Sequence, residues 1–183
     1  AVAEKQMGEA APEVLCIPEK HALAKTGDAF APRYRTILLS QQTFFKRDPS
    51  FWAVGAHELG HAILHRRYPW FVMPVMLFRK LSTQVVAYAF TIMMVNMFFA
   101  SQAVLNVALG LYWLGFALST FVCVDEFLAS VIAVRVLKAD GRLRPDHWFG
   151  VYGALFTAFL TYLGAAIGSL TVVLLYGDVA ARL

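Results

Sequence analysis

The chain has 183 residues, 59% of them hydrophobic and 15% charged, with a formal net charge of +4. A soluble domain carries about 25% charged residues, so this composition excludes an ordinary soluble protein and indicates helices that cross a membrane. The positive charge does not indicate a nucleic-acid partner, because Lys and Arg lie beside the apolar segments and no nucleic-acid-binding motif is present. These basic residues are expected to contact membrane lipid.

The first part of the chain, residues 1–50, is polar and mixed and forms the expected extramembrane part. Its segment 33–40, RYRTILLS, is short and rich in strand-favouring residues, and it is the one predicted strand region. The residues before it are predicted to form polar helix or loop. A helix is predicted from residue 50 to residue 67, because Asp48 can cap its start and Pro49 suits the first helical position.

The rest of the chain contains long apolar segments. Residues 82–100 and 103–124 are each close to the roughly 20 residues that cross a bilayer, and only Ser101 and Gln102 separate them. We interpret residues 82–124 as a transmembrane hairpin; one very long buried helix is the alternative. A helix over residues 125–138 is predicted to follow, and residues 149–176 form a third transmembrane segment.

The predicted helix 50–67 contains His57-Glu58-Leu59-Gly60-His61, an HExxH pattern. His57 and His61 are four residues apart, so both imidazoles project from one face of a helix and can bind one ion. Neutral imidazole nitrogens suit Zn²⁺. Glu58 can take a proton from water at the metal while a peptide carbonyl is attacked. The pattern also occurs by chance, so its context decides whether it predicts a zinc-dependent endopeptidase with Glu58 as the catalytic base.

A catalytic zinc requires three protein ligands and an open position. The metzincin arrangement needs a third His where this chain has Arg67. The gluzincin arrangement needs a Glu on a later helix followed by small residues, and DEFLAS at residues 125–130 provides it. Glu126 is therefore the predicted third ligand; an acidic residue at a helix start beside the membrane is the alternative. Ser130, one turn later, is either a group that orients a ligand by hydrogen bonding or a small packing residue.

The membrane topology agrees with this ligand set. If the hairpin 82–124 crosses the bilayer and returns, Glu126 lies on the same side as His57 and His61. Fifteen of the sixteen Lys and Arg residues precede Trp148, so the positive-inside rule predicts that the zinc lies on the cytoplasmic, matrix or stromal face. The protein is expected to be an integral protein of a bacterial inner membrane or an organellar membrane.

The order of these motifs resembles that of a known family. RYRTILLS, AHELGHAILH, YPWFVMP and DEFLASVIAVRVL, followed by the last apolar segment, are similar to the neutral zinc metallopeptidases, the YugP-like membrane zinc peptidases. The resemblance covers about residues 20–175. It implies Zn²⁺ bound by His57, His61 and Glu126, with Glu58 as the base, and a gluzincin-like core in a membrane. The expected fold is mainly α: a small zincin-like α+β extramembrane part with one short strand region, joined to about three transmembrane helices. Residues 1–183 are expected to form a single membrane-embedded metallopeptidase domain.

Other interpretations stay open at this point. The chain could be a catalytically silent, peptidase-like structural or assembly subunit, whose apolar helices bind other membrane-protein subunits. An intramembrane protease of the site-2 kind would need an Asp-Gly motif within a span, but Asp140-Gly141 lies outside the apolar segments. For the enzyme, the expected substrate is a membrane or unfolded polypeptide. Strand 33–40 would either pair with an extended substrate at a sheet edge or be purely structural.

Overall fold

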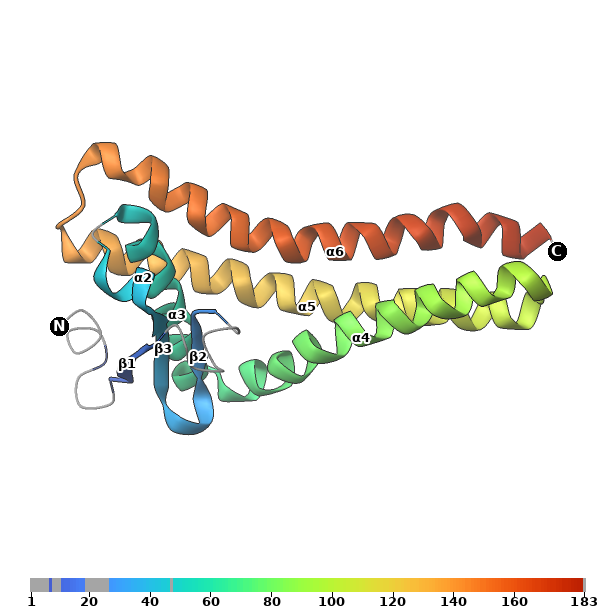
Figure 1. Ribbon diagram of the computed structural model, residues 1–183, viewed down its shortest axis with the longest axis horizontal. Coiled ribbons are helices and arrows are strands. Elements are labelled where there is room, and N and C mark those ends of the chain that lie inside the picture. Colours follow the sequence, from blue (N-terminus) through green and yellow to red (C-terminus); the bar gives the residue numbers. More distant parts are fainter. Residues whose placement is uncertain (1–6, 8–10, 19–26, 47, 183) are drawn as a thin grey trace. The chain divides into compact units, whose positions relative to one another are not determined.

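The computed structural model describes residues 7, 11–18, 27–46 and 48–182 (Figure 1). The fold is mainly α with one small sheet, which confirms the predicted fold class. Two short 3-10 helices, Pro32–Tyr34 and Pro145–His147, accompany the regular elements. These elements are β1 (Glu13–Ile17), β2 (Ala29–Ala31), β3 (Thr36–Ser40), α2 (Gln41–Phe45), α3 (Pro49–Arg67), α4 (Pro69–Phe99), α5 (Gln102–Asp140) and α6 (Trp148–Arg182).

Internal packing divides the chain into two compact units. Unit 1 is Ala1–Val72 with Asp125–Phe159, and unit 2 is Met73–Val124 with Leu160–Leu183. Unit 1 therefore holds the sheet, α3 and the C-terminal part of α5, whereas unit 2 holds most of α4 and the N-terminal part of α5. The single membrane-embedded domain stays a prediction.

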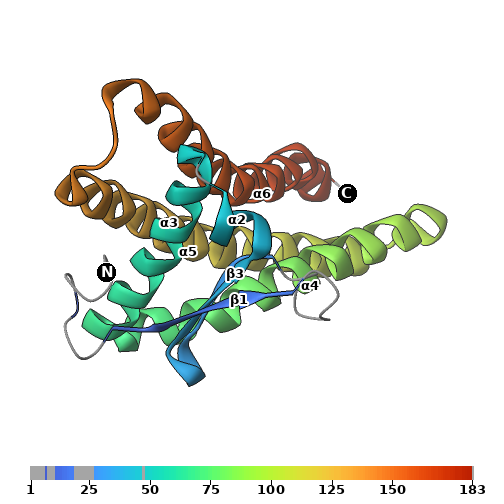
Figure 2. The same cartoon turned by 60° about the vertical axis from the view of Figure 1, so that its left-hand side comes forward.

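The sheet of unit 1 has the strand order β1-β3-β2, with β1 parallel and β2 antiparallel to β3 (Figure 1, Figure 2). The observed strand β3 is shorter than the predicted range 33–40. The first residues of that range belong to the 3-10 helix, and Arg35 then adopts a left-handed backbone with φ 53°. Strands β1 and β2 were not predicted, since β1 lies between two prolines and β2 is the three-residue sequence AFA. Because β3 is the central strand, it offers no free edge to a substrate.

Helix α3 begins as predicted. Asp48 accepts a hydrogen bond from the Ser50 backbone N–H at 2.8 Å, and Pro49 is the first helical residue. The helix is buried on most sides rather than along one stripe. On one side Leu59 packs with Ile37 and Leu39 of the sheet, and these residues share a core cluster with α5.

Helices α3 and α5 cross at very short range within unit 1. A Cβ atom placed on Gly60 would overlap the backbone oxygen of Ala129 and would lie 3.1 Å from its Cα atom. Ala129 is fully buried and also packs with Leu64 and Val72. Only glycine at position 60 permits this separation, so Gly60 sets the distance between the two helices.

In unit 2, α4 and α5 form an antiparallel hairpin. The Phe78 and Phe121 rings lie 5.7 Å apart, and Gly115 faces Val86 nearer the turn. The chain reverses at Ala100, whose φ is 47°, and the Asn96 side chain accepts a hydrogen bond from the Ser101 backbone N–H at 2.9 Å. This left-handed residue separates α4 from α5, so the segment forms two helices rather than one very long helix.

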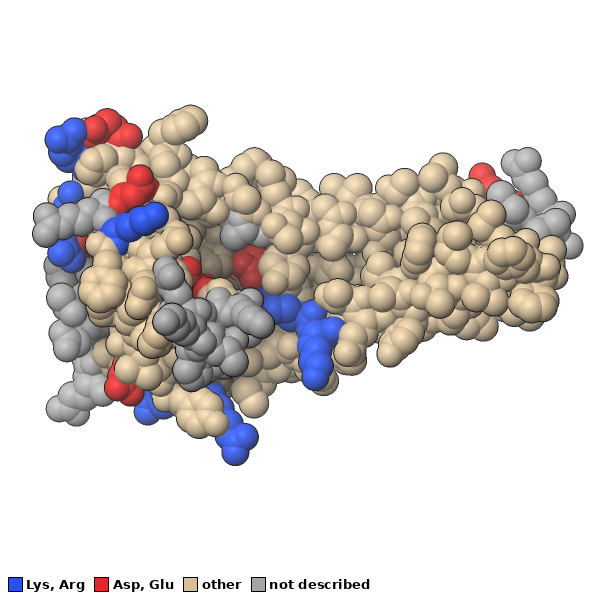
Figure 3. All heavy atoms as spheres, viewed as in Figure 1, with Lys and Arg blue, Asp and Glu red and all other residues tan. Residues whose placement is uncertain are grey.

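Within the described part of the chain, three helices are long and apolar enough to cross a membrane: Pro69–Phe99, Gln102–Asp140 and Pro145–Asp178. Large apolar side chains of unit 2 are exposed, including Phe98 at 87%. Lys, Arg, Asp and Glu are absent from residues 81–124 and 149–176, and large areas of the surface in Figure 3 lack charge. Such a surface suits lipid rather than water. Helix α5 also continues past the apolar segment to Asp140, so the predicted ligand-bearing helix is its continuation.

The crossing predicts opposite effects for two glycines of α3. Gly60→Ala should destabilise the protein by about 1–3 kcal/mol, because the methyl group meets backbone that cannot move aside cheaply. Gly55→Ala is the matched control, since its methyl group would lie 3.8 Å from Leu39 Cδ1, an ordinary contact, and alanine favours the helix by about 1 kcal/mol. Thermal unfolding midpoints in detergent measure both changes. Equal midpoints for the two variants would contradict the close crossing.

Candidate metal centre

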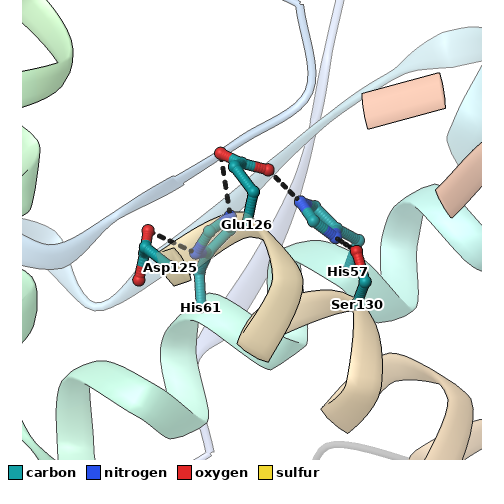
Figure 4. Close-up of polar contacts among 5 residues, drawn as sticks. All are labelled: His57, His61, Asp125, Glu126 and Ser130. Atoms are coloured by element: carbon teal, nitrogen blue, oxygen red, sulfur yellow. Dashed lines mark hydrogen bonds and ion pairs between the residues drawn. The ribbon is translucent and has the colours of Figure 1, made fainter. Parts of the chain in front are cut away.

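The predicted site residues come together within unit 1, from two helices (Figure 4). Helix α3 provides His57, Glu58 and His61, and α5 provides Glu126. His57 and His61 are one turn apart on the face of α3 that meets α5, and their rings lie 4.7 Å apart at 86° to each other. Glu126 is placed opposite them because Gly60 allows α5 to approach.

The three predicted ligands converge on one point. The Nε2 atom of His57 lies 2.9 Å from Glu126 Oε2, and the Nε2 atom of His61 lies 3.7 Å from Glu126 Oε1. Among the described residues, His57, His61 and Glu126 form the one group whose ligand atoms all lie within 4.8 Å of one another. Tetrahedral zinc with ligands at about 2.0–2.1 Å separates its ligand atoms by about 3.4 Å. The two distances from Glu126 to the histidine Nε2 atoms, 2.9 Å and 3.7 Å, lie on either side of that value, so the group fits Zn²⁺.

The charge balance of the site also fits a cation. Glu58, Asp125 and Glu126 are all buried, the last two at 2% and 3% exposure. A positive charge nearby stabilises buried carboxylates. A dication bound by His57, His61 and Glu126 would supply such a charge, so the acidic character of the site is compatible with a metal.

The Nδ1 atoms of the two histidines face away from Glu126 and contact other groups. Ser130 Oγ lies 3.3 Å from His57 Nδ1, and Asp125 Oδ2 lies 3.3 Å from His61 Nδ1. Ser130 was singled out from the sequence as a candidate for this contact. The role of Asp125 was missed, although its carboxylate directly precedes Glu126. Adjacent helical residues point about 100° apart, so the sequence did not indicate that both would reach the same ring.

Glu58, the predicted base, lies beside the histidines without joining the ligand group. Burial raises the pKa of Glu58 above its ordinary value, while the two histidines and a hydrogen bond from the Phe30 backbone lower it in part. Phe30 lies in β2, so the edge of the sheet is next to this carboxylate. A carboxylate with a raised pKa is a better proton acceptor near neutral pH.

The electrostatics of His61 are dominated by the two acids around it. Burial by itself lowers the pKa of His61, but hydrogen bonds and charge attraction from Asp125 and Glu126 outweigh burial and raise this pKa to about 9. In the metal-free protein His61 is therefore protonated at neutral pH. His65, one turn further along α3, is outside the group and packs edge-on against the Phe30 ring at 5.8 Å.

Comparison with known proteins points to a zinc-dependent family. A family model described as "Putative neutral zinc metallopeptidase" matches residues 17–179. The chain is 26% identical over 155 residues to "Putative membrane protease YugP" of Bacillus subtilis (strain 168), covering 84% of this chain and 68% of that protein. No solved structure matches the chain. The predicted cofactor, Zn²⁺, is confirmed by the family match together with the His–His–Glu group.

Zinc binding should release close to one proton at about pH 7.5. The metal-free His61 has a pKa of about 9 and carries a proton at that pH, whereas an imidazole bound to zinc through Nε2 and paired through Nδ1 is neutral. An ordinary imidazole, with a pKa near 6.5, would release only about a tenth of a proton. The affinity of the protein for Zn²⁺ should therefore rise with pH until about pH 9 and should be lost as the pH falls.

Titration calorimetry in two buffers with different ionisation enthalpies measures this proton release. The metal-free protein is titrated with Zn²⁺ in each buffer, and the difference in heat gives the number of protons. The matched control is His65→Gln, which removes an imidazole outside the group and should leave the number unchanged. A release near zero for the wild type would contradict the protonated His61.

Proposed function

The chain belongs to the neutral zinc metallopeptidase family, and from this premise we propose that it is a membrane endopeptidase that hydrolyses peptide bonds with Zn²⁺ held by His57, His61 and Glu126. The observation that carries the proposal is the convergence of these three buried ligands beside Glu58. Three protein ligands leave a position open, which is the arrangement of catalytic rather than structural zinc.

Each residue has a distinct role in the proposed reaction. Zn²⁺ bound there would supply Lewis acidity for the peptide carbonyl and would lower the pKa of water. His57 and His61 would hold the ion with their imidazoles, and Glu126 would hold it with its carboxylate. Glu58 takes a proton from the attacking water and passes it to the departing amine. The raised pKa of Glu58 supports this role, because the base must hold the proton between the two steps.

The substrate that we propose is a membrane or unfolded polypeptide. The chain is a membrane protein, and its relative carries the name of a membrane protease. Strand β2 is an edge of the described sheet, and the Phe30 backbone N–H points at Glu58. An extended substrate segment that pairs along β2 would therefore pass the base. We therefore propose β2, rather than β3, as the strand that pairs with substrate, because β3 is paired on both sides.

For the membrane orientation, we propose that the site faces the cytoplasm, or the matrix or stroma of an organelle. Arg66 and Arg67 end the HExxH helix α3, and Arg79 and Lys80 precede the uncharged part of α4. Basic residues at such positions are retained on the inner face. Two crossings by the hairpin then bring Glu126 back to that face.

Removing the base should separate metal binding from hydrolysis. Glu58→Gln should retain Zn²⁺, because Glu58 is not a ligand, and should lower the cleavage rate by about 10²–10⁴-fold, because the proton acceptor is lost. Elemental analysis of the protein purified in detergent measures the metal, and cleavage of an unfolded membrane polypeptide measures the activity. Glu126→Ala is the matched comparison, which should lose both. Zinc without cleavage in the wild type would favour a silent structural or assembly subunit.

The orientation predicts opposite labelling of two positions. In a background with Cys16 and Cys123 replaced by Ser, His65→Cys should be protected from an impermeant thiol reagent in intact cells, whereas Ser101→Cys at the hairpin turn should react. Both should react after the membrane is permeabilised. Labelling of position 65 in intact cells would overturn the proposed side.

A further inference from the structure

Asp125 is the most buried acidic side chain among the described residues, at 2% exposure. It directly precedes the ligand Glu126 in α5, and both carboxylates contact the same imidazole. Asp125 Oδ2 lies 3.3 Å from His61 Nδ1, while Glu126 Oε1 lies 3.7 Å from His61 Nε2 (Figure 4). The ring is therefore held between two consecutive residues of one helix.

This contact determines which nitrogen of His61 is available to a metal. An acceptor at Nδ1 requires the proton to stay on Nδ1 in the neutral ring, which leaves the lone pair on Nε2. Nε2 is the atom that points toward His57 and Glu126. The negative charge of Asp125 also makes the imidazole a stronger donor to a cation.

The two histidines differ in this respect. His57 Nδ1 contacts the Ser130 hydroxyl, which is neutral and can donate or accept, so it does not fix the ring's tautomer. His61 Nδ1 contacts a carboxylate, an anion that accepts hydrogen bonds and has no hydrogen to donate. The carboxylate of Asp125 therefore constrains the tautomer of His61 more strongly than the Ser130 hydroxyl constrains that of His57.

We propose that Asp125 is a positioning residue that holds His61 in the Nδ1–H tautomer and orients its Nε2 atom toward the metal position. Asp125 does not touch the metal or the substrate and acts only through His61. The inference rests on the proposed function, since it takes His61 as a zinc ligand.

The test measures metal binding in the full chain purified in detergent. Asp125→Asn should weaken Zn²⁺ affinity by about 10–100-fold, measured by competition with a chelator. It should also change the visible absorption spectrum of the Co²⁺-substituted protein, because His61 is no longer held. Asp125→Glu should recover part of the affinity. Asp140→Asn is the matched control, since it removes a carboxylate from the same helix outside the site and should change neither quantity.

The outcomes separate this inference from the proposed function. If Asp125→Asn binds Zn²⁺ as the wild type does, with the same Co²⁺ spectrum, Asp125 is not a positioning residue and the metal site stands. If the wild type binds no Zn²⁺, or His61→Ala binds it equally well, both proposals are overturned.

A measurement on the wild type covers the case in which Asp125→Asn does not fold. Nitrogen–proton correlation spectra of the zinc-loaded protein report the tautomer of each histidine. A protonated Nδ1 on His61 supports the inference. A proton on Nε2, with the metal on Nδ1, overturns it.

Discussion

The close crossing of α3 and α5 at Gly60 and Ala129 is the constraint on which the site depends. The ligands come from helices far apart in the sequence, and neither helix alone offers three of them. A side chain at position 60 would separate the helices, and Glu126 would no longer meet the two Nε2 atoms. The same glycine that weakens α3 as a helix therefore makes the ligand group possible. Position 60 therefore has a residue with low helix propensity at the point where the two backbones are in contact.

The crossing also gathers acidic side chains around one histidine. It brings Asp125 and Glu126 into the interior with Glu58 and places them against His61. In the metal-free protein the raised pKa of His61 supplies one positive charge, which compensates part of the acidic excess. A bound Zn²⁺ would take the place of that proton and add positive charge beside the carboxylates. Metal binding and the stability of this core are therefore coupled.

The sequence predicted the parts of this structure that follow from local rules. The cap at Asp48, the HExxH helix, the apolar segments and Glu126 as a partner for the histidines all rest on spacing, capping or hydropathy. The elements that were missed depend on contacts distant in the chain. Strand β2 has only three residues and is a strand because β3 lies beside it. The contact of Asp125 with His61 depends on the crossing angle of two helices, which no spacing rule encodes.

The location of the chemistry follows from the charge pattern. Helix α3 is not among the helices of the described chain that are long and apolar enough to cross a membrane, whereas α4, α5 and α6 are. Hydrolysis needs water and a base, and buried carboxylates are costly in hydrocarbon. Placing the HExxH helix in unit 1, beside the sheet, keeps the polar site out of the uncharged segments 81–124 and 149–176. An intramembrane protease would carry the same motif inside a spanning helix. In the described chain the HExxH helix is thus separate from the apolar segments, and the helix that carries Glu126 continues from one of them.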